Sequence, residues 1–283
     1  MQANEKYKMT NTLKRLARNV LQQFDVGITR YSTLQRLFHE SRVLHYVKAK
    51  NKNIDLILEM SDKQLRQLLP LIFKSNAQLW QDLFVLSELG FKRNGYFVEF
   101  GATNGIDLSN SYLLEKEFGW NGILAEPAKC WHKDLRNNRS AAIETRCVWR
   151  DSRSILHFNE VSISELSTIN SFSLSDNHQR KREVGKVYDV KTISLIDLLV
   201  TYNAPKIVDF LSIDTEGSEY EILSNFDFDK YQFRVITCEH NFTPMRGKIF
   251  SLLTENGYVR KYRELSSFDD WYIRETALPM TAY

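Results

Sequence analysis

The sequence contains little cysteine and no metal-binding cysteine motif. Its 283 residues include 3 cysteines, Cys130, Cys147 and Cys238, and none belongs to a CxxC pair or to a cysteine–histidine cluster. Nothing in the sequence therefore indicates a structural zinc site or a disulfide framework. Unpaired thiols are typical of a protein in a reducing compartment.

The sequence also lacks long hydrophobic runs. No stretch approaches the roughly 20 apolar residues that cross a bilayer, and the first residues lack the apolar core of a signal peptide. We therefore expect a cytoplasmic protein with no membrane span.

An excess of charge of one sign is missing as well. The net charge of +3 does not by itself indicate a nucleic-acid partner. Basic residues nevertheless crowd the first segment, where acids are few: Lys6, Lys8, Lys14, Arg15, Arg18, Arg30, Arg36, Arg42, Lys48, Lys50 and Lys52. A solvated helical face is the favoured interpretation, and contact with an anionic partner such as a nucleotide-sugar, a glycolipid head group or a membrane surface is the alternative.

The composition is otherwise that of a globular protein, with 43% hydrophobic and 26% charged residues. The length suits one α/β domain with an appendage. Apolar residues recur at helical spacing through residues 1–75, which predicts an α-helical N-terminal extension. This extension either caps the main domain, residues 76–283, or joins copies of the chain in a homo-oligomer.

The most informative stretch is a strand–turn–helix–strand pattern. Tyr96–Phe100 is a short β-branched and aromatic run that ends at Gly101 and Gly105. A helical pattern follows, and Ile123–Ala125 forms a second buried strand that ends at Glu126. Such a βαβ unit places the first turn and the acid after the second strand at the carboxyl edge of a parallel sheet, where nucleoside-like cofactors bind.

The glycine spacing indicates which cofactor this turn binds. A dinucleotide fold needs G-x-G-x-x-G to hold a pyrophosphate, whereas here an acid precedes the first glycine: Glu99-x-Gly101-x-x-x-Gly105. S-adenosylmethionine (SAM) has no phosphate, and its ammonium suits a carboxylate at a strand end. Glu126 then accepts hydrogen bonds from both ribose hydroxyls. The alternative is that the glycines only form a turn and that Glu126 is solvated.

At this point a family resemblance can be stated. The stretch EFGATNGIDLSNSYLLEKEFGWNGILAEP, followed by LSIDTEGSEYEIL and ITCEHN, resembles the FkbM-type family of SAM-dependent methyltransferases from roughly Ser75 to the C-terminus. The resemblance implies a class I, Rossmann-like α/β fold with a mostly parallel seven-stranded sheet and helices on both faces. The residues expected to bind SAM are Glu99, Gly101, Ala102, Asn104, Gly105, Ser109, Glu126, Asp151 and Asp214; for Asp151, a plain turn role is the alternative.

Two polar groups follow adjacent strands of this expected sheet, Asp214 with Glu216 and Glu239 with His240 and Asn241. Methyl transfer to an alcohol needs a deprotonated nucleophile, and two mechanisms supply it. In the first, His240 or Glu216 is the general base. In the second, Asp214 and Glu239, with His240 or Asn241, hold Mg²⁺ or another hard cation. The alternative is that the acids only cap the next helix and that His240 is a core residue.

Three further features carry predictions. Residues 141–149 read as one strand, and Ser218 to Glu221 reads as a capping box that starts a helix. The polar stretch Ser162–Val187 is the candidate substrate lid, with Arg180, Lys181 and Arg182 on phosphate or sulfate groups, unless it is simply a solvated loop. The other histidines, His39, His45, His132, His157 and His178, show no partner pattern.

The resemblance implies O-methylation, and a sugar in a nucleotide-sugar or cell-surface glycan is the expected acceptor. Methylation of a small-molecule or polyketide hydroxyl or carboxyl is one alternative. An RNA methyltransferase and a non-catalytic SAM-binding module are two others. The sequence lacks an aromatic-plus-basic reader motif, so no nucleic-acid partner is expected.

Overall fold

The computed structural model describes residue 56 and residues 59–275. The chain divides into two compact units, Met1–Phe73 and Lys74–Tyr283. In the first unit, the described elements are α5 (Asp62–Leu68) and η1 (Leu69–Leu71). Most of the helical extension predicted for residues 1–75 lies outside the described residues. Among the helices that are described, none has the length and apolar composition that a membrane crossing requires.

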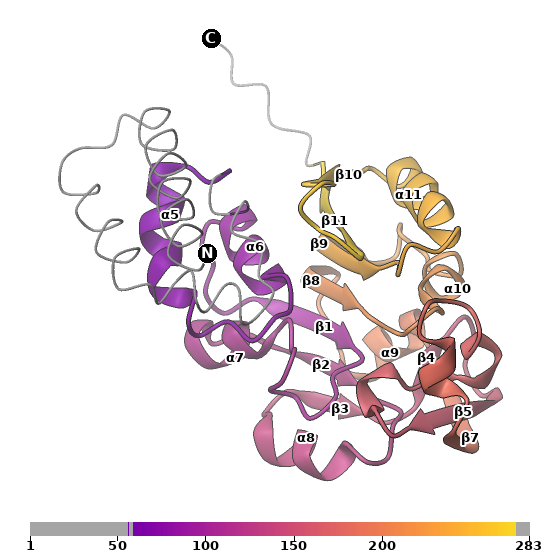
Figure 1. Cartoon of the computed structure of the whole chain (residues 1–283). Helices are drawn as coiled ribbons and strands as arrows, with labels where there is room; N and C mark the ends of the chain where they lie inside the picture. The colour runs from indigo at the N-terminus through magenta and orange to yellow at the C-terminus, as the bar shows by residue number, and fades with distance from the viewer. Residues whose placement is uncertain (1–55, 57–58, 276–283) are drawn as a thin grey trace, which may run out of the picture. The chain divides into compact units, whose positions relative to one another are not determined.

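The second unit is built on a seven-stranded sheet (Figure 1). The strand order is β3-β2-β1-β8-β9-β11-β10; the first five strands are parallel, and β11 is antiparallel to both of its neighbours. This topology confirms the predicted Rossmann-like fold. The strands are β1 (Tyr96–Phe100), β2 (Asn121–Ala125), β3 (Ala142–Glu144), β8 (Ile207–Ile213), β9 (Gln232–Glu239), β10 (Tyr258–Lys261) and β11 (Asp269–Arg274).

Helices cover both faces of this sheet. Right-handed crossovers from β1 to β2 and from β8 to β9 run in opposite directions along the sheet, so their helices lie on opposite faces. On one face, Val98 and Phe100 of β1 pack in a core with Leu198, Ile222 and Leu253. Those three come from α9, α10 and α11, which lie across the sheet from α7 and α8 in Figure 1. The helices are α6 (Gln81–Glu88), α7 (Tyr112–Phe118), α8 (His132–Asn138), α9 (Leu195–Thr201), α10 (Glu219–Leu223) and α11 (Met245–Glu255).

The single strand predicted for residues 141–149 is wrong, because the chain changes sheet there. β3 ends at Glu144, and β4 (Cys147–Trp149) joins a separate four-stranded sheet of order β4-β7-β5-β6. Between them, the Glu144 carboxylate accepts hydrogen bonds from the backbone and the guanidinium of Arg146, which turns the chain. The other strands are β5 (Ile155–Val161), β6 (Thr168–Ile169) and β7 (Gly185–Ser194).

The polar stretch between β5 and β7 is folded onto this second sheet. Besides β6, it forms three short 3₁₀ turns: η2 (Ser164–Leu166), η3 (Asn170–Phe172) and η4 (Gln179–Arg182). The Asn159 side chain of β5 donates hydrogen bonds of 3.0 Å to the Ser173 hydroxyl and to the Arg182 carbonyl. We call residues 162–184 the insertion.

Candidate active site

The carboxyl edge of the large sheet opens into a cavity of about 350 Å³. Cavities of this size hold small molecules. Three parts of the chain line it: the ends of β1 and β2, the ends of β8 and β9, and the insertion. The lining residues used below are Glu99, Gly101, Thr103, Asn110, Glu126, Leu166, His178, Asp214, Glu216, Glu239 and Asn241.

The turn after β1 lies against the end of β8. Gly101 has a φ of +73°, and a Cβ atom there would lie 2.2 Å from the backbone oxygen of Asp214. Its N–H donates to the Ala125 carbonyl at the end of β2 (3.1 Å). Glycine is therefore required here by both its conformation and the close approach of another strand.

The Glu99 carboxylate stabilises the chain that follows this turn by accepting several hydrogen bonds. It accepts hydrogen bonds from the Ser109 hydroxyl (3.0 Å), the Asn110 N–H (2.7 Å) and the Ser111 hydroxyl. The buried Arg139 guanidinium lies 3.9 Å from Glu99 and donates to both serine hydroxyls. Glu99 also lines the cavity, and its contact with an ammonium stays a prediction. Sequence reasoning missed Arg139, because no motif marks it.

Glu126 is buried at the end of β2 with both carboxylate oxygens engaged. Oε2 accepts from the Thr103 N–H and Oε1 from the Ala128 N–H, each at 2.8 Å. Burial raises the pKa of Glu126 to about 7, although these two hydrogen bonds oppose the shift. Each oxygen keeps a second lone pair, so Glu126 fits the predicted contact with two hydroxyls.

Of the residues predicted to bind SAM, several shape the site without lining the cavity: Ala102, Asn104, Gly105, Ser109 and Asp151. The Asn104 Oδ1 accepts from the N–H groups of Ile106 and Asp107 (2.9 Å each) and so forms the turn. Asp151 accepts from the Ser154 hydroxyl and is substantially exposed. This geometry supports no direct cofactor contact for Asn104 or Asp151.

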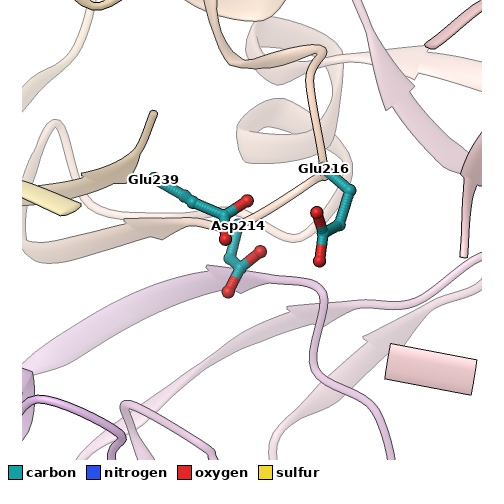
Figure 2. A group of neighbouring side chains, drawn as sticks. All are labelled: Asp214, Glu216 and Glu239. Carbon is teal, nitrogen blue, oxygen red and sulfur yellow. The ribbon is translucent and has the colours of Figure 1, made fainter. Parts of the chain in front are cut away.

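Three acids meet where β8 and β9 end. Figure 2 shows the Asp214 and Glu239 carboxylates beside one another, with Glu216 pointing to the same space from the loop after β8. Each of the three offers an oxygen, and these oxygens lie within 4.8 Å of one another. The Oε2 atom of Glu239 is buried and has no hydrogen-bond partner among the described residues.

Burial shifts the protonation of all three acids. It raises the pKa of Asp214 to about 6 and that of Glu239 well above its ordinary value. It also raises the pKa of Glu216, with the negative charge of Asp214 adding to the shift and the Arg182 guanidinium opposing it. Carboxylates this close cannot all ionise without a compensating positive charge. The cluster therefore either shares protons or holds a cation.

One compensating charge comes from the insertion. Arg182 is fully buried, and its Nη2 lies 2.7 Å from Glu216 Oε2. The same guanidinium donates to both Asp176 oxygens (2.9 and 3.1 Å) and, through Nε, to the Leu166 carbonyl (2.7 Å). The prediction that Arg182 binds a phosphate or sulfate is wrong, because its donors already face these partners. The other two members of the basic trio are exposed.

The turn before α10 differs from the predicted capping box. The Ser218 hydroxyl donates to Thr215 Oγ1 (2.8 Å) and caps nothing. Instead, the Glu219 carboxylate accepts from the N–H groups of Thr215 and Gly217 (3.0 Å each). Because Glu219 binds these amides, Asp214 and Glu216 are not the groups that cap this helix.

His240 lies outside the cavity lining. Its Nδ1 accepts from the Phe242 N–H (3.0 Å), and its Nε2 is 3.8 Å from Asp270 Oδ1. Burial lowers its pKa. The role of general base predicted for His240 is not supported by this position. Its neighbour Asn241 does line the cavity and donates to Glu216 Oε2 (3.0 Å).

The comparison with protein families bears directly on this geometry. A family model described as the methyltransferase FkbM domain matches residues 99–260, more than half of the chain. The chain belongs to the FkbM methyltransferase family. Among curated proteins, none matches the sequence of this FkbM methyltransferase significantly.

Solved methyltransferase structures show low similarity to this FkbM chain. A candidate RNA methyltransferase of Pyrococcus horikoshii has 14% identity and a TM-score of 0.33, over 64% of this chain and 66% of the other. A precorrin-6y C5,15-methyltransferase of Geobacter metallireducens has 14% identity and a TM-score of 0.35, over 68% and 84%. A TehB-like SAM-dependent methyltransferase of Corynebacterium glutamicum has 7% identity and a TM-score of 0.35, over 74% and 95%. Such low TM-scores support no further statement about the FkbM chain.

The cavity of this FkbM methyltransferase fits SAM, the expected cofactor. Gly101 leaves room beside the backbone, and Glu126 keeps lone pairs for hydroxyl donors. The Asn110 Oδ1 is buried at the cavity wall and finds no partner among the described residues. These residues offer one unpaired acceptor and a carboxylate to a polar ligand.

Sequence reasoning assigned no role to His178, a cavity residue of this FkbM chain. His178 lies in the insertion, directly before η4, and lines the cavity. In the sequence it stands in a polar stretch without hydrophobic periodicity, so no pattern connected it to the site.

Proposed function

We propose that this FkbM methyltransferase transfers a methyl group from SAM to a hydroxyl of a sugar, within a nucleotide-sugar or a cell-surface glycan. SAM supplies the methyl group on a positively charged sulfonium. The observation that carries the proposal is the shared cavity, which Gly101 and Glu126 of the cofactor end line together with the three carboxylates of the acceptor end, Asp214, Glu216 and Glu239.

The chemistry of the second end supports a hydroxyl acceptor. Ionised carboxylates only accept hydrogen bonds, and a sugar offers several hydroxyl donors close together. The RNA alternative is disfavoured because the sequence lacks an aromatic-plus-basic reader motif.

We also propose that Asp214, Glu216 and Glu239 hold a divalent cation such as Mg²⁺. Hard cations prefer carboxylate oxygens, and the unpartnered Oε2 of Glu239 fits such a role. A cation here would lower the pKa of the acceptor hydroxyl. The Arg182 contact to Glu216 leaves that residue the weakest of the three ligands.

Calorimetry with SAM tests the cofactor half of the proposal, and we expect binding in the micromolar range. Absence of binding tighter than about 1 mM would falsify the proposed function. Mass spectrometry of methyl transfer to UDP-glucose, GDP-mannose, dTDP-rhamnose and a matched panel of hydroxy acids tests the acceptor. Transfer only to the hydroxy acids contradicts the sugar assignment.

Removal of metal tests the cation. We expect EDTA to abolish transfer and added Mg²⁺ to restore it. Glu239→Gln should lose the rise in melting temperature that Mg²⁺ gives the unmodified chain. Full activity in EDTA rules out the cation and leaves the rest of the proposal intact.

A further inference from the structure

The insertion brings a neutral histidine to the acceptor end of the cavity. Of the four histidines within residues 59–275, namely His132, His157, His178 and His240, only His178 lines the cavity. Its side chain is partly buried, and burial lowers its pKa below the ordinary 6.5. At neutral pH the imidazole is therefore uncharged and keeps one nitrogen lone pair that can accept a proton.

A chain of polar contacts fixes this histidine relative to the acids. The Asp176 Oδ1 accepts from the backbone N–H of His178 (2.7 Å) and from Arg182 Nη1 (2.9 Å). Arg182 in turn donates to Glu216 at 2.7 Å. The pattern Asp176-x-His178-x-x-x-Arg182 thus connects the insertion to the end of β8.

We propose that His178 is the general base of the reaction and accepts the proton of the acceptor hydroxyl; this rests on the proposed function. The acceptor oxygen forms a bond to the methyl carbon as the carbon–sulfur bond breaks, and that electron pair stays on sulfur. The hydroxyl proton moves to an imidazole nitrogen of His178 and later to water.

The other bases of the site are less available. Oε2 of Glu216 already accepts hydrogen bonds from Arg182 and Asn241. Asp214 and Glu239 are the ligands that a cation would take. His240 does not line the cavity. His178 is the remaining base with a suitable proton affinity.

Charged groups of both signs face His178, and they decide the pH dependence. Within the insertion, Asp176 favours the charged imidazole, whereas Lys181 and Arg182 oppose it together with burial. The other acids that line the same cavity are Glu99, Glu126, Glu165, Asp214, Glu216 and Glu239. Since the active form is neutral, kcat should fall on the acid side of pH 6.5.

The test compares His178→Asn with His157→Asn in the full chain. His157 lies on β5 with a largely exposed side chain, so it is a matched histidine outside the site. We expect His178→Asn to lower kcat about 10²- to 10⁴-fold and to remove the acid limb of the pH profile. His157→Asn should leave both unchanged. Added imidazole should restore part of the activity of His178→Ala.

Two further readouts separate this proposal from the proposed function. SAM affinity by calorimetry should stay within about twofold in His178→Asn, because His178 acts on the acceptor; loss of SAM binding in the unmodified chain defeats the function instead. Proton NMR should show an imidazole signal, absent in His178→Asn, that titrates below pH 6.5. Unchanged kcat in His178→Asn, or a titration above pH 6.5, overturns the assignment. His178→Gln replaces the Asn variant if that variant does not fold.

Discussion

The buried carboxylates at the two ends of the cavity differ in how many backbone N–H groups they accept hydrogen bonds from. At the cofactor end, Glu99 and Glu126 are buried, but each accepts at least one hydrogen bond from a backbone N–H. At the acceptor end, Asp214, Glu216 and Glu239 lie together, and none of their carboxylates accepts from a backbone N–H of the described residues. Burial raises the pKa of each.

This difference indicates how each end is stabilised. Backbone amides belong to the turn itself, so at the cofactor end they oppose the effect of burial on Glu126 before a ligand binds. The acceptor end depends on a positive charge from elsewhere in the chain, namely Arg182, and in our proposal on a cation. We expect the acceptor end to respond much more strongly to pH, metal and distant substitutions.

Arg182→Ala should have the largest effect, and it acts on the acceptor end. It leaves Asp176 and Glu216 buried without their cation, which costs about 3–5 kcal/mol of the free energy of unfolding. The exposed Arg180→Ala is the matched control and should change the stability by less than about 0.5 kcal/mol. Urea unfolding measures both, and equal effects from the two variants contradict the comparison.

Glu126→Ala tests the cofactor end and should weaken the binding of SAM. We expect SAM affinity to fall about 100-fold, or about 3 kcal/mol, because two ribose contacts and the acceptor for Thr103 are lost together. Glu255→Ala, an exposed acid on α11, is the control. Calorimetry measures the Kd for SAM. A Kd within threefold of the control would contradict the contact between Glu126 and the ribose.

Asp214→Asn should have the smallest effect and should stabilise the protein at high pH. The folded pKa of about 6 lies above the unfolded value near 3.8, so the folded state binds more protons between these values. Stability therefore falls as pH rises from about 4 to about 6, and the penalty persists above that range. In EDTA at pH 8, the neutral variant should gain about 1–3 kcal/mol. Urea unfolding at pH 5 and pH 8 measures this.

The same variant, Asp214→Asn, also tests the proposed cation site. Mg²⁺ at pH 8 should stabilise the unmodified chain and leave Asp214→Asn nearly unaffected. If both respond equally to Mg²⁺, the cation binds elsewhere. If the variant loses stability between pH 5 and pH 8 as steeply as the unmodified chain, the charge of Asp214 is not what destabilises the acceptor end.

Strands and turns whose bounds depend on residues close together in the sequence could be predicted well. The strand Tyr96–Phe100 has the predicted bounds, because it is a short β-branched and aromatic run that ends at a glycine turn. The turn with Gly101 and Gly105 is also where the pattern placed it. By contrast, residues 141–149 read as one strand, and only the Glu144–Arg146 turn reveals that they serve two sheets.

The sequence by itself determined the Rossmann-like architecture, the cofactor turn and the acids at the strand ends. Those features follow from hydrophobic periodicity and from short-range spacing, which fix where each strand ends. Only the tertiary structure decided that Arg182 neutralises Glu216, that His240 points away from the cavity and that His178 lines it. These facts depend on how the insertion packs against the sheet edge, and contacts between residues so far apart in the chain leave no local periodic signal.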